Sequence, residues 1–221
     1  MSLPKPPKIS YTVKFDANGG EGKLPGDITA IAGEAFKDCK RLTSVVIPDS
    51  VTSIGYSAFY GCSKLTSVNI PDGVTSIGDS AFIKCSSLTN VSIPDSVTSI
   101  GSSAFEYCSS LQFNEYDNAN YLGNESNPYF ALIEANDSNI TSCNINEATK
   151  MIVGRAFDNC DSLTTVTIPV SVVSIGQSVF RYLDNLKTVN YRGTKEQWNA
   201  ISIGNYNDSL AKATINYNYT D

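Results

Sequence analysis

The chain has 221 residues, of which 41% are hydrophobic and 17% charged, so it can fold into one or two ordinary domains. Its formal net charge is −6 and it contains no histidine, which excludes His-dependent catalytic triads and His-ligated zinc and disfavours nucleic acid as a partner. No apolar run is long enough to span a bilayer, so membrane insertion is not expected.

Residues 1–23 are expected to form an N-terminal extension or cap. The opening MSL followed by PKPPK is typical of a trimmed protein. A native export signal and an anchor are therefore expected to lie outside this stretch of chain.

Residues 24–190 are built from a repeated unit. The phrase IPDSVTSIG begins at Ile47 and at Ile93, and IPDGVTSIG begins at Ile70. Three residue types recur every 23 residues: Phe36, Phe59, Phe82 and Phe105; Cys39, Cys62, Cys85 and Cys108; Leu42, Leu65, Leu88 and Leu111. A period of this length is typical of leucine-rich repeats, whose units stack and share one continuous core.

Each unit predicts one short parallel strand. Val45 and Ile47 alternate with Ser44 and Val46, as on a strand with one buried face, and Pro48 ends the strand. Further along the unit, the apolar residues have a helix-like spacing: Ala58, Phe59, Cys62 and Leu65. We predict an α/β leucine-rich-repeat solenoid with one strand per coil and short helical or 3₁₀ turns on the opposite wall.

A glycine follows the isoleucine in most units, as at Gly55, Gly78, Gly101 and Gly176. Glycine is needed there either because the backbone adopts a left-handed conformation or because neighbouring coils pack too closely for a side chain. Val153 occupies the same position in another unit, and a β-branched residue rarely adopts a positive φ. Close packing is therefore the favoured explanation.

Six cysteines follow the repeat rather than a metal-ligand pattern. Five share one inward position, and Cys143 replaces a strand valine. Stacked side chains point in parallel rather than toward each other, so buried thiols are favoured over disulfides. No cofactor or metal is expected. Asp49, Asp72 and Asp95 also stack, either as turn residues or as a weak cation site.

One coil departs from the period, since 29 residues separate Leu111 from Ile140. Its longer segment, residues 114–139, carries Tyr116, Tyr121, Tyr129 and Phe130. These rings either form exposed contact points or fold back to fill the irregular coil.

The outward side of the strands is a second candidate surface, because curved solenoids often bind partners there. Its residues are mostly small and polar, with one aromatic and acidic break at Phe113 and Glu115. It is either a solvated surface or a binding face for protein or glycan. The candidate ligand-binding residues are Phe113, Glu115, Tyr121, Tyr129, Phe130, Asn90, Ser92 and Asn144.

Residues 191–221 are expected to form a C-terminal cap. RGTKEQWNAI predicts a short helix that begins near Thr194 and turns Trp198 and Ile201 inward. The alternating ATINYNY predicts a strand.

The unit IPDSVTSIGxxAFxxCxxL resembles the BspA-like subfamily of bacterial leucine-rich repeats. This resemblance implies a surface-exposed or secreted protein associated with adhesion, and it supplies no catalytic residue. YTVKFDANGG at residues 11–20 resembles the start of the Listeria–Bacteroides repeat of cell-wall proteins, which also implies a surface location.

The combined expectation is an extracellular or cell-surface binding module, not an enzyme and a monomer as expressed. Its expected partner is a host or bacterial surface protein, with a glycan as a further candidate. The alternatives are a passive spacer within a larger surface protein and a glycan-binding module.

Overall fold

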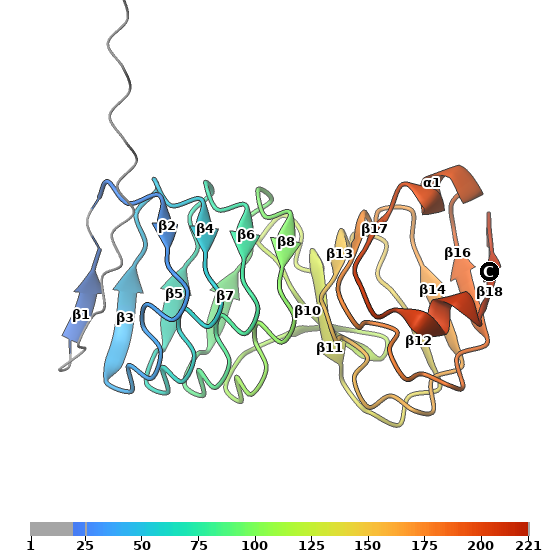
Figure 1. The fold of residues 1–221 in the computed structure, drawn as a ribbon, viewed down its shortest axis with the longest axis horizontal. Coiled ribbons are helices and arrows are strands. Elements are labelled where there is room, and N and C mark those ends of the chain that lie inside the picture. Colours follow the sequence, from blue (N-terminus) through green and yellow to red (C-terminus); the bar gives the residue numbers. More distant parts are fainter. Residues whose placement is uncertain (1–19, 25, 221) are drawn as a thin grey trace, which may run out of the picture.

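The computed structural model describes residues 20–24 and 26–220, which form an elongated stack of coils (Figure 1). The expected N-terminal extension lies largely outside the described residues. The predicted leucine-rich-repeat solenoid is confirmed, with successive coils packed side by side along one axis (Figure 1). No helix in the described part of the chain has the length and apolar character needed to cross a membrane.

The predicted strands form a parallel sheet, which we call the strand wall. In the first half it contains β1 (Gly20–Lys23), β3 (Leu42–Val46), β5 (Ser67–Asn69) and β7 (Asn90–Ser92). Val45 pairs with Val68 and Val68 with Val91, so equivalent residues of neighbouring coils lie opposite one another. These valines are buried, whereas the flanking residues point outward. The 23-residue period therefore sets the register of the sheet.

Each of these coils also contains a second strand that the sequence analysis did not predict. The additional strands are only two residues long: β2 (Ala30–Ile31), β4 (Ser53–Ile54), β6 (Ser76–Ile77) and β8 (Ser99–Ile100). They form their own parallel sheet across the core from the strand wall. A turn closed by Val51 N–H donating to the Pro48 carbonyl reverses the chain between the two walls.

The third side of each coil, which we call the turn wall, consists of short turns, as expected. In residues 55–65 it consists of successive turns in which alternate N–H groups donate to the carbonyl three residues earlier, as from Tyr60 to Ser57. The N–H groups of Ser57, Phe59 and Gly61 donate instead to the next coil. Ser57 and Gly61 both have left-handed φ angles, of 50° and 71°. Two left-handed residues per coil prevent a continuous helix, because a right-handed helix requires negative φ throughout. The predicted short turns are therefore present as isolated 3₁₀-type turns and do not join into a continuous helix.

Close packing explains the glycine that follows the isoleucine. Gly78 has no left-handed φ, and a Cβ added there would lie 2.6 Å from the carbonyl carbon of Gly55 in the previous coil. A side chain would thus overlap the neighbouring backbone, which confirms the preferred interpretation.

The stack is interrupted by an antiparallel insertion of three strands, β9 (Asn114–Tyr116), β10 (Ala119–Leu122) and β11 (Ala131–Ala135). We call residues 114–135 the hairpin insertion. The coils before it, residues 30–111, are the first stack, and the coils after it, residues 140–216, are the second stack. The strand wall is consequently divided into two separate sheets, and the buried residues form two core clusters.

The second stack resumes the repeat. Its strand wall contains β12 (Ser142–Asn144), β14 (Thr165–Ile168), β16 (Thr188–Tyr191) and β18 (Thr214–Asn216). Its second wall contains β13 (Met151–Ile152), β15 (Ser174–Ile175) and β17 (Ser202–Ile203), and this sheet continues into β11 of the hairpin insertion. A short 3₁₀ helix, Asp208–Ala211, precedes β18.

The predicted C-terminal helix is confirmed as α1 (Lys195–Asn199). Thr194 is its N-cap, and the Gln197 side chain accepts a hydrogen bond from the Thr194 backbone in return. Trp198 and Ile201 are buried as expected, and the Trp198 ring meets Tyr191 edge-on at 5.3 Å. The helix therefore connects β16 to β17 and adds Trp198 and Ile201 to the second core cluster.

All six cysteines are thiols, as predicted, and five of them are buried. In the first stack three thiols donate to a carbonyl of the preceding coil, as Cys85 does to Phe59 at 3.1 Å. Burial raises the pKa of Cys62 and Cys108 to about 12. These thiols are therefore protonated core residues at neutral pH.

Candidate binding surface

The predicted binding residues of the first stack lie on the strand wall. Asn90 and Ser92 occupy the two outward positions of β7 and are exposed. Because β7 is the last strand of its sheet, both lie where the first strand wall ends. Ser92 borders a hollow of about 390 Å³ that also includes Asn69, Asp95 and Asn124.

The hairpin insertion occupies the space between the two strand walls. Its tip, Asp117 and Asn118, attaches to the free edge of β12, the first strand in the strand wall of the second stack. The Asp117 carboxylate accepts a hydrogen bond from the Asn144 N–H, and the Asn118 side chain donates to the Ser142 carbonyl at 2.8 Å. Side chains thus replace a neighbouring strand and protect an edge that would otherwise be open.

The aromatic residues of the insertion follow the second of the two expected arrangements, in which the rings fold back to fill the irregular coil. Tyr121 is fully buried and Phe130 is only 4% exposed, so neither is an exposed contact residue. Tyr129 is half-buried and its ring contacts Tyr121 and Tyr116 edge-on, with centroids 5.6 and 5.9 Å apart. An antiparallel insertion cannot share the side-chain columns of the repeat, so it needs large rings of its own to fill the interior.

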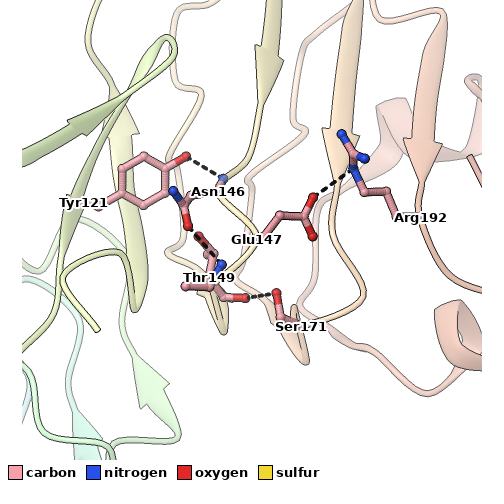
Figure 2. A network of polar contacts seen from close by, with 7 residues as sticks. Tyr121, Asn146, Glu147, Thr149, Ser171 and Arg192 are labelled. Carbon is pink, nitrogen blue, oxygen red and sulfur yellow. Dashed lines mark hydrogen bonds and ion pairs between the residues drawn. The ribbon is translucent and has the colours of Figure 1, made fainter. Parts of the chain in front are cut away.

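A polar network holds the insertion against the second stack (Figure 2). The Tyr121 hydroxyl accepts a hydrogen bond from the Asn146 N–H at 3.4 Å, and burial raises the pKa of this tyrosine above its ordinary range. Figure 2 also shows Ser171 donating to the Thr149 carbonyl at 2.7 Å and Arg192 paired with Glu147 at 2.9 Å. These contacts fix the loop after β12, so this network has a structural role.

The remaining predicted residues lie at different depths. Phe113 is half-buried and packs against the first core cluster, while Glu115 is exposed on β9. Asn144 is half-buried, and its side-chain oxygen accepts no hydrogen bond within the part of the chain that the structure describes. Glu115 lines an open hollow of about 620 Å³ together with Asn118, Asn136 and Asp137. The predicted residues therefore divide between two hollows and the core.

Sequence reasoning missed the exposed tyrosines of the turn wall. Tyr107, Tyr182 and Tyr206 are 66%, 70% and 58% exposed, and all three have left-handed φ angles. The guanidinium of Arg181 lies 4.3 Å from the Tyr182 ring centroid and 5.6 Å from that of Tyr206. Tyr107 and Tyr182 occupy the position that Gly61 has in its own coil. Asp38, Lys84 and Asn159 occupy the same position in other coils, so no recurring residue type gave a signal for these tyrosines.

Among the described residues, no group of three or more histidine, cysteine, aspartate or glutamate side chains is arranged to hold a metal ion. The candidate surface is therefore formed by neutral amides, hydroxyls, a few carboxylates and exposed rings.

Comparison with known families gives a match over most of the chain. A family model described as BspA type Leucine rich repeat region matches residues 18–130 and 135–220, in six copies. No curated protein sequence matches the chain significantly.

Several solved bacterial structures are similar to the chain. A leucine-rich repeat protein of T. pallidum is 28% identical, with 84% of this chain and 73% of that chain covered and a TM-score of 0.48. A leucine-rich cell surface protein of Faecalibacterium prausnitzii is 28% identical, with 82% and 62% covered and a TM-score of 0.36. A leucine-rich repeat protein of Bacteroides ovatus is 26% identical, with 89% and 55% covered and a TM-score of 0.45. The chain thus spans less than two thirds of the latter two.

Proposed function

The chain belongs to the BspA-type leucine-rich repeat family, and from that premise we propose that it is a non-catalytic module that binds another protein. The proposed contact surface is the outward strand wall around the hairpin insertion, from Asn90 and Ser92 on β7 to Glu115 and Tyr116 on β9. The partner is a protein on a host or bacterial surface, and the module acts outside the cell as a monomer.

The observation that carries this proposal is that the strand wall is interrupted at one place. Elsewhere its outward positions are mostly small polar residues, such as Ser67 and Asn69, with Val46 as an exposed apolar exception. At the insertion, Glu115 is exposed and Tyr116 is 37% exposed beside the half-buried Tyr129. Binding energy in protein interfaces concentrates in a few aromatic and charged residues, so a specific contact is favoured where these side chains gather.

The charge of the chain supports a protein rather than a nucleic acid partner. With a net charge of −6, the chain repels phosphate backbones at long range. Short-range contacts of neutral amides and tyrosine rings must then supply the affinity. Such a surface suits a protein, and a glycan array distinguishes the glycan alternative.

The test is a binding screen of the intact chain against immobilised extracellular-matrix proteins and a glycan array. The double variant Glu115→Gln/Tyr116→Ala should weaken binding to the protein found by at least tenfold, because both side chains are exposed at the interruption. Its matched control, Ser67→Ala/Asn69→Ala, lies on the same wall and should change affinity less than twofold.

Equal losses in the two double variants would contradict a local contact and indicate diffuse binding by the whole wall. Binding to glycans alone would support the glycan-binding alternative, and no binding in either screen would support the passive spacer. A substitution of Phe113 would not separate binding from folding, because its half-buried ring packs on the core.

A further inference from the structure

A cleft of about 340 Å³ lies on the turn wall, at the junction of the two stacks. One side is the last turn segment of the first stack, residues 103–107, and the other is residues 154–160 of the second stack. The end of β11, residues 133–135, also lines the cleft. Elsewhere in the first stack, consecutive turn segments are in direct contact through backbone hydrogen bonds.

Those hydrogen bonds form a regular ladder. Ser80, Phe82 and Lys84 each donate their N–H to the next coil, to the carbonyls of Ser102, Ala104 and Glu106, at 3.0, 2.8 and 3.0 Å. The two preceding coils repeat the same three bonds. The turn wall of each coil therefore offers three donors, spaced two residues apart, in the direction of the following coil.

The ladder stops at the cleft. Ser103, Phe105 and Tyr107 are the equivalent donors of the last coil, and their N–H groups reach no acceptor within residues 20–24 and 26–220. Phe105 is itself only 3% exposed. Backbone donors without a protein partner leave an open edge, because each N–H can still gain an acceptor from an added chain. A row of three equivalent unpaired donors is thus an edge that another chain can satisfy.

The opposite side of the cleft is only partly occupied. The Ala156 carbonyl accepts the N–H of Ala135, so β11 replaces one bond of the ladder. The carbonyls on either side, those of Gly154 and Asp158, accept no backbone N–H in the described part of the chain. A segment lying in the cleft can therefore accept from one side and donate to the other.

The charges around the cleft define which segment fits. Glu106, Glu134 and Asp158 line it together with a single cation, Arg155. The Glu134 side chain is partly buried and its one hydrogen bond is a long contact of 3.4 Å with Asn120. Burial and, to a smaller degree, the nearby Glu106 carboxylate raise the pKa of Glu134, while the bond from Asn120 opposes the rise. A lysine or arginine side chain entering the cleft would stabilise these carboxylates.

We propose that this cleft binds an extended polypeptide segment of about six residues that carries a basic side chain. Backbone carbonyls of the segment accept from Ser103, Phe105 and Tyr107, as in strand addition at an open edge. Its lysine or arginine lies between Glu106 and Glu134. The inference rests on the proposed function only in that the partner is a protein. It locates a different contact, on the turn wall rather than the strand wall.

The probe is a set of fluorescent hexapeptide pools in which one position is fixed as lysine, arginine, glutamate or leucine. The best lysine or arginine pool should bind at least tenfold more tightly than the matching glutamate pool. At saturation, amide hydrogen exchange at Phe105 and Tyr107 should slow at least tenfold, because these donors become hydrogen-bonded. Exchange at Asn90 and Ser92 on the strand wall should not change.

The double variant Glu106→Gln/Glu134→Gln should weaken the lysine and arginine pools at least fivefold and change the leucine pools less than twofold. The control Glu115→Gln removes a carboxylate from the strand wall and should affect no pool. An unchanged thermal midpoint verifies that each variant is folded.

Absence of binding by any pool, equal affinity for lysine and glutamate pools, or protection confined to the strand wall would each overturn the inference. The proposed function fails independently of it, since that function depends on Glu115 and Tyr116. The two proposals can also be separated with a protein partner. If Glu115→Gln/Tyr116→Ala abolishes its binding and Glu106→Gln/Glu134→Gln leaves its binding unchanged, the result supports the proposed function and not the cleft.

Discussion

The coils before the hairpin insertion stack more regularly than those after it. In the first stack the rings of Phe36, Phe59, Phe82 and Phe105 form one column, with neighbouring centroids 5.0, 5.2 and 5.4 Å apart and planes within 5°. In the second stack Phe157 and Phe180 lie 5.8 Å apart and are tilted by 36°. The same repeat thus produces a strict column in one region and a looser one in the other.

The backbone shows the same difference on the turn wall. Three hydrogen bonds join each pair of coils in the first stack, whereas Arg155 makes the corresponding single bond between the first two coils of the second stack. Further on, the Phe180 N–H donates to the Asn207 side chain instead of a carbonyl. Regular side-chain columns and complete backbone pairing occur together, because both require neighbouring coils to have the same shape.

Alkaline pH should destabilise both stacks, and this is the largest effect we expect. Burial raises the pKa of Cys62, Cys108 and Cys143 to about 12, whereas an unfolded thiol titrates near about 8.5. Stability is therefore constant below about pH 8 and falls as the pH rises toward 12, because only the unfolded chain releases these protons. At pH 10 each thiol should cost about 2 kcal/mol, measured by urea denaturation at pH 7 and pH 10.

The variant Cys143→Val provides the control for that measurement, because valine pairs with this position in the next strand, at Val166. It should lose stability less steeply with pH than the parent chain. Identical pH dependence in the two proteins would show that the Cys143 thiol ionises equally in both states.

Phe82→Ala tests the strict column directly. The Phe82 ring is fully buried and stacks on Phe59 and Phe105, so its removal should lower the free energy of unfolding by about 3–5 kcal/mol. Ser92→Ala, on the exposed strand wall, should change it by less than about 0.5 kcal/mol. Comparable denaturation midpoints for the two variants would contradict the assignment of inside and outside.

Gly78→Ala tests whether the coils tolerate any added volume between their backbones. The new Cβ would lie 2.6 Å from the Gly55 carbonyl carbon, so the coils must separate, at a cost of about 3 kcal/mol. Gly26→Ala is the matched control, because a Cβ there meets nothing within 4 Å. Thermal unfolding distinguishes them, and a neutral Gly78→Ala would mean that the stack is not tightly packed here.

Asp117→Gly tests the attachment of the hairpin insertion to the second stack. It removes the carboxylate that accepts the Asn144 N–H, and glycine keeps the left-handed φ of 50° accessible. We expect a loss of about 1.5–3 kcal/mol and faster amide exchange at Asn144.

Asp38→Gly is its control, since Asp38 also has a left-handed φ, of 58°, and its side chain makes no hydrogen bond within the described residues. An equal loss at both positions would show that the effect comes from the backbone and not from the cap.

Thr194→Ala should have the smallest effect, about 1 kcal/mol, because it removes one side-chain cap from a five-residue helix at the end of the second stack. Lys195→Ala, at an exposed neighbouring position, should be nearly neutral. Circular dichroism during thermal unfolding measures both. A larger loss than that of Phe82→Ala would mean that the C-terminal cap controls the stability of the whole chain.

Repetition made the strand wall, its register and the cysteine column predictable, since a side chain that recurs every 23 residues can only stack on its equivalents. The second strand of each coil was missed because two residues, such as Ser53 and Ile54, are too few to show a period. The left-handed positions were missed as well, because serine, lysine and tyrosine occupy them as well as glycine. The boundaries at residues 24, 190 and 191 stay predictions.

The binding residues were less predictable than the fold. Three candidate residues are exposed as expected: Asn90, Ser92 and Glu115. They lie at outward positions in the alternation of buried and exposed side chains along a repeat strand or its continuation. For Tyr121 and Phe130 the sequence left open whether the rings are exposed or fold inward, because their partners lie in an antiparallel hairpin whose pairing has no sequence period. The cleft at Ser103–Tyr107 was not anticipated for the same reason.

The sequence by itself determined that this chain is a stack of coils, because each coil leaves apolar surface that only an equivalent neighbour can cover. The tertiary structure alone decided where the stack is divided and what that division exposes. The hairpin insertion fills its own interior with Tyr121 and Phe130 and supplies one backbone bond, from Ala135 to Ala156, where a regular coil would supply three. The filled interior and the incomplete backbone pairing both depend on contacts between residues that are far apart in the chain. A local sequence pattern does not predict such contacts.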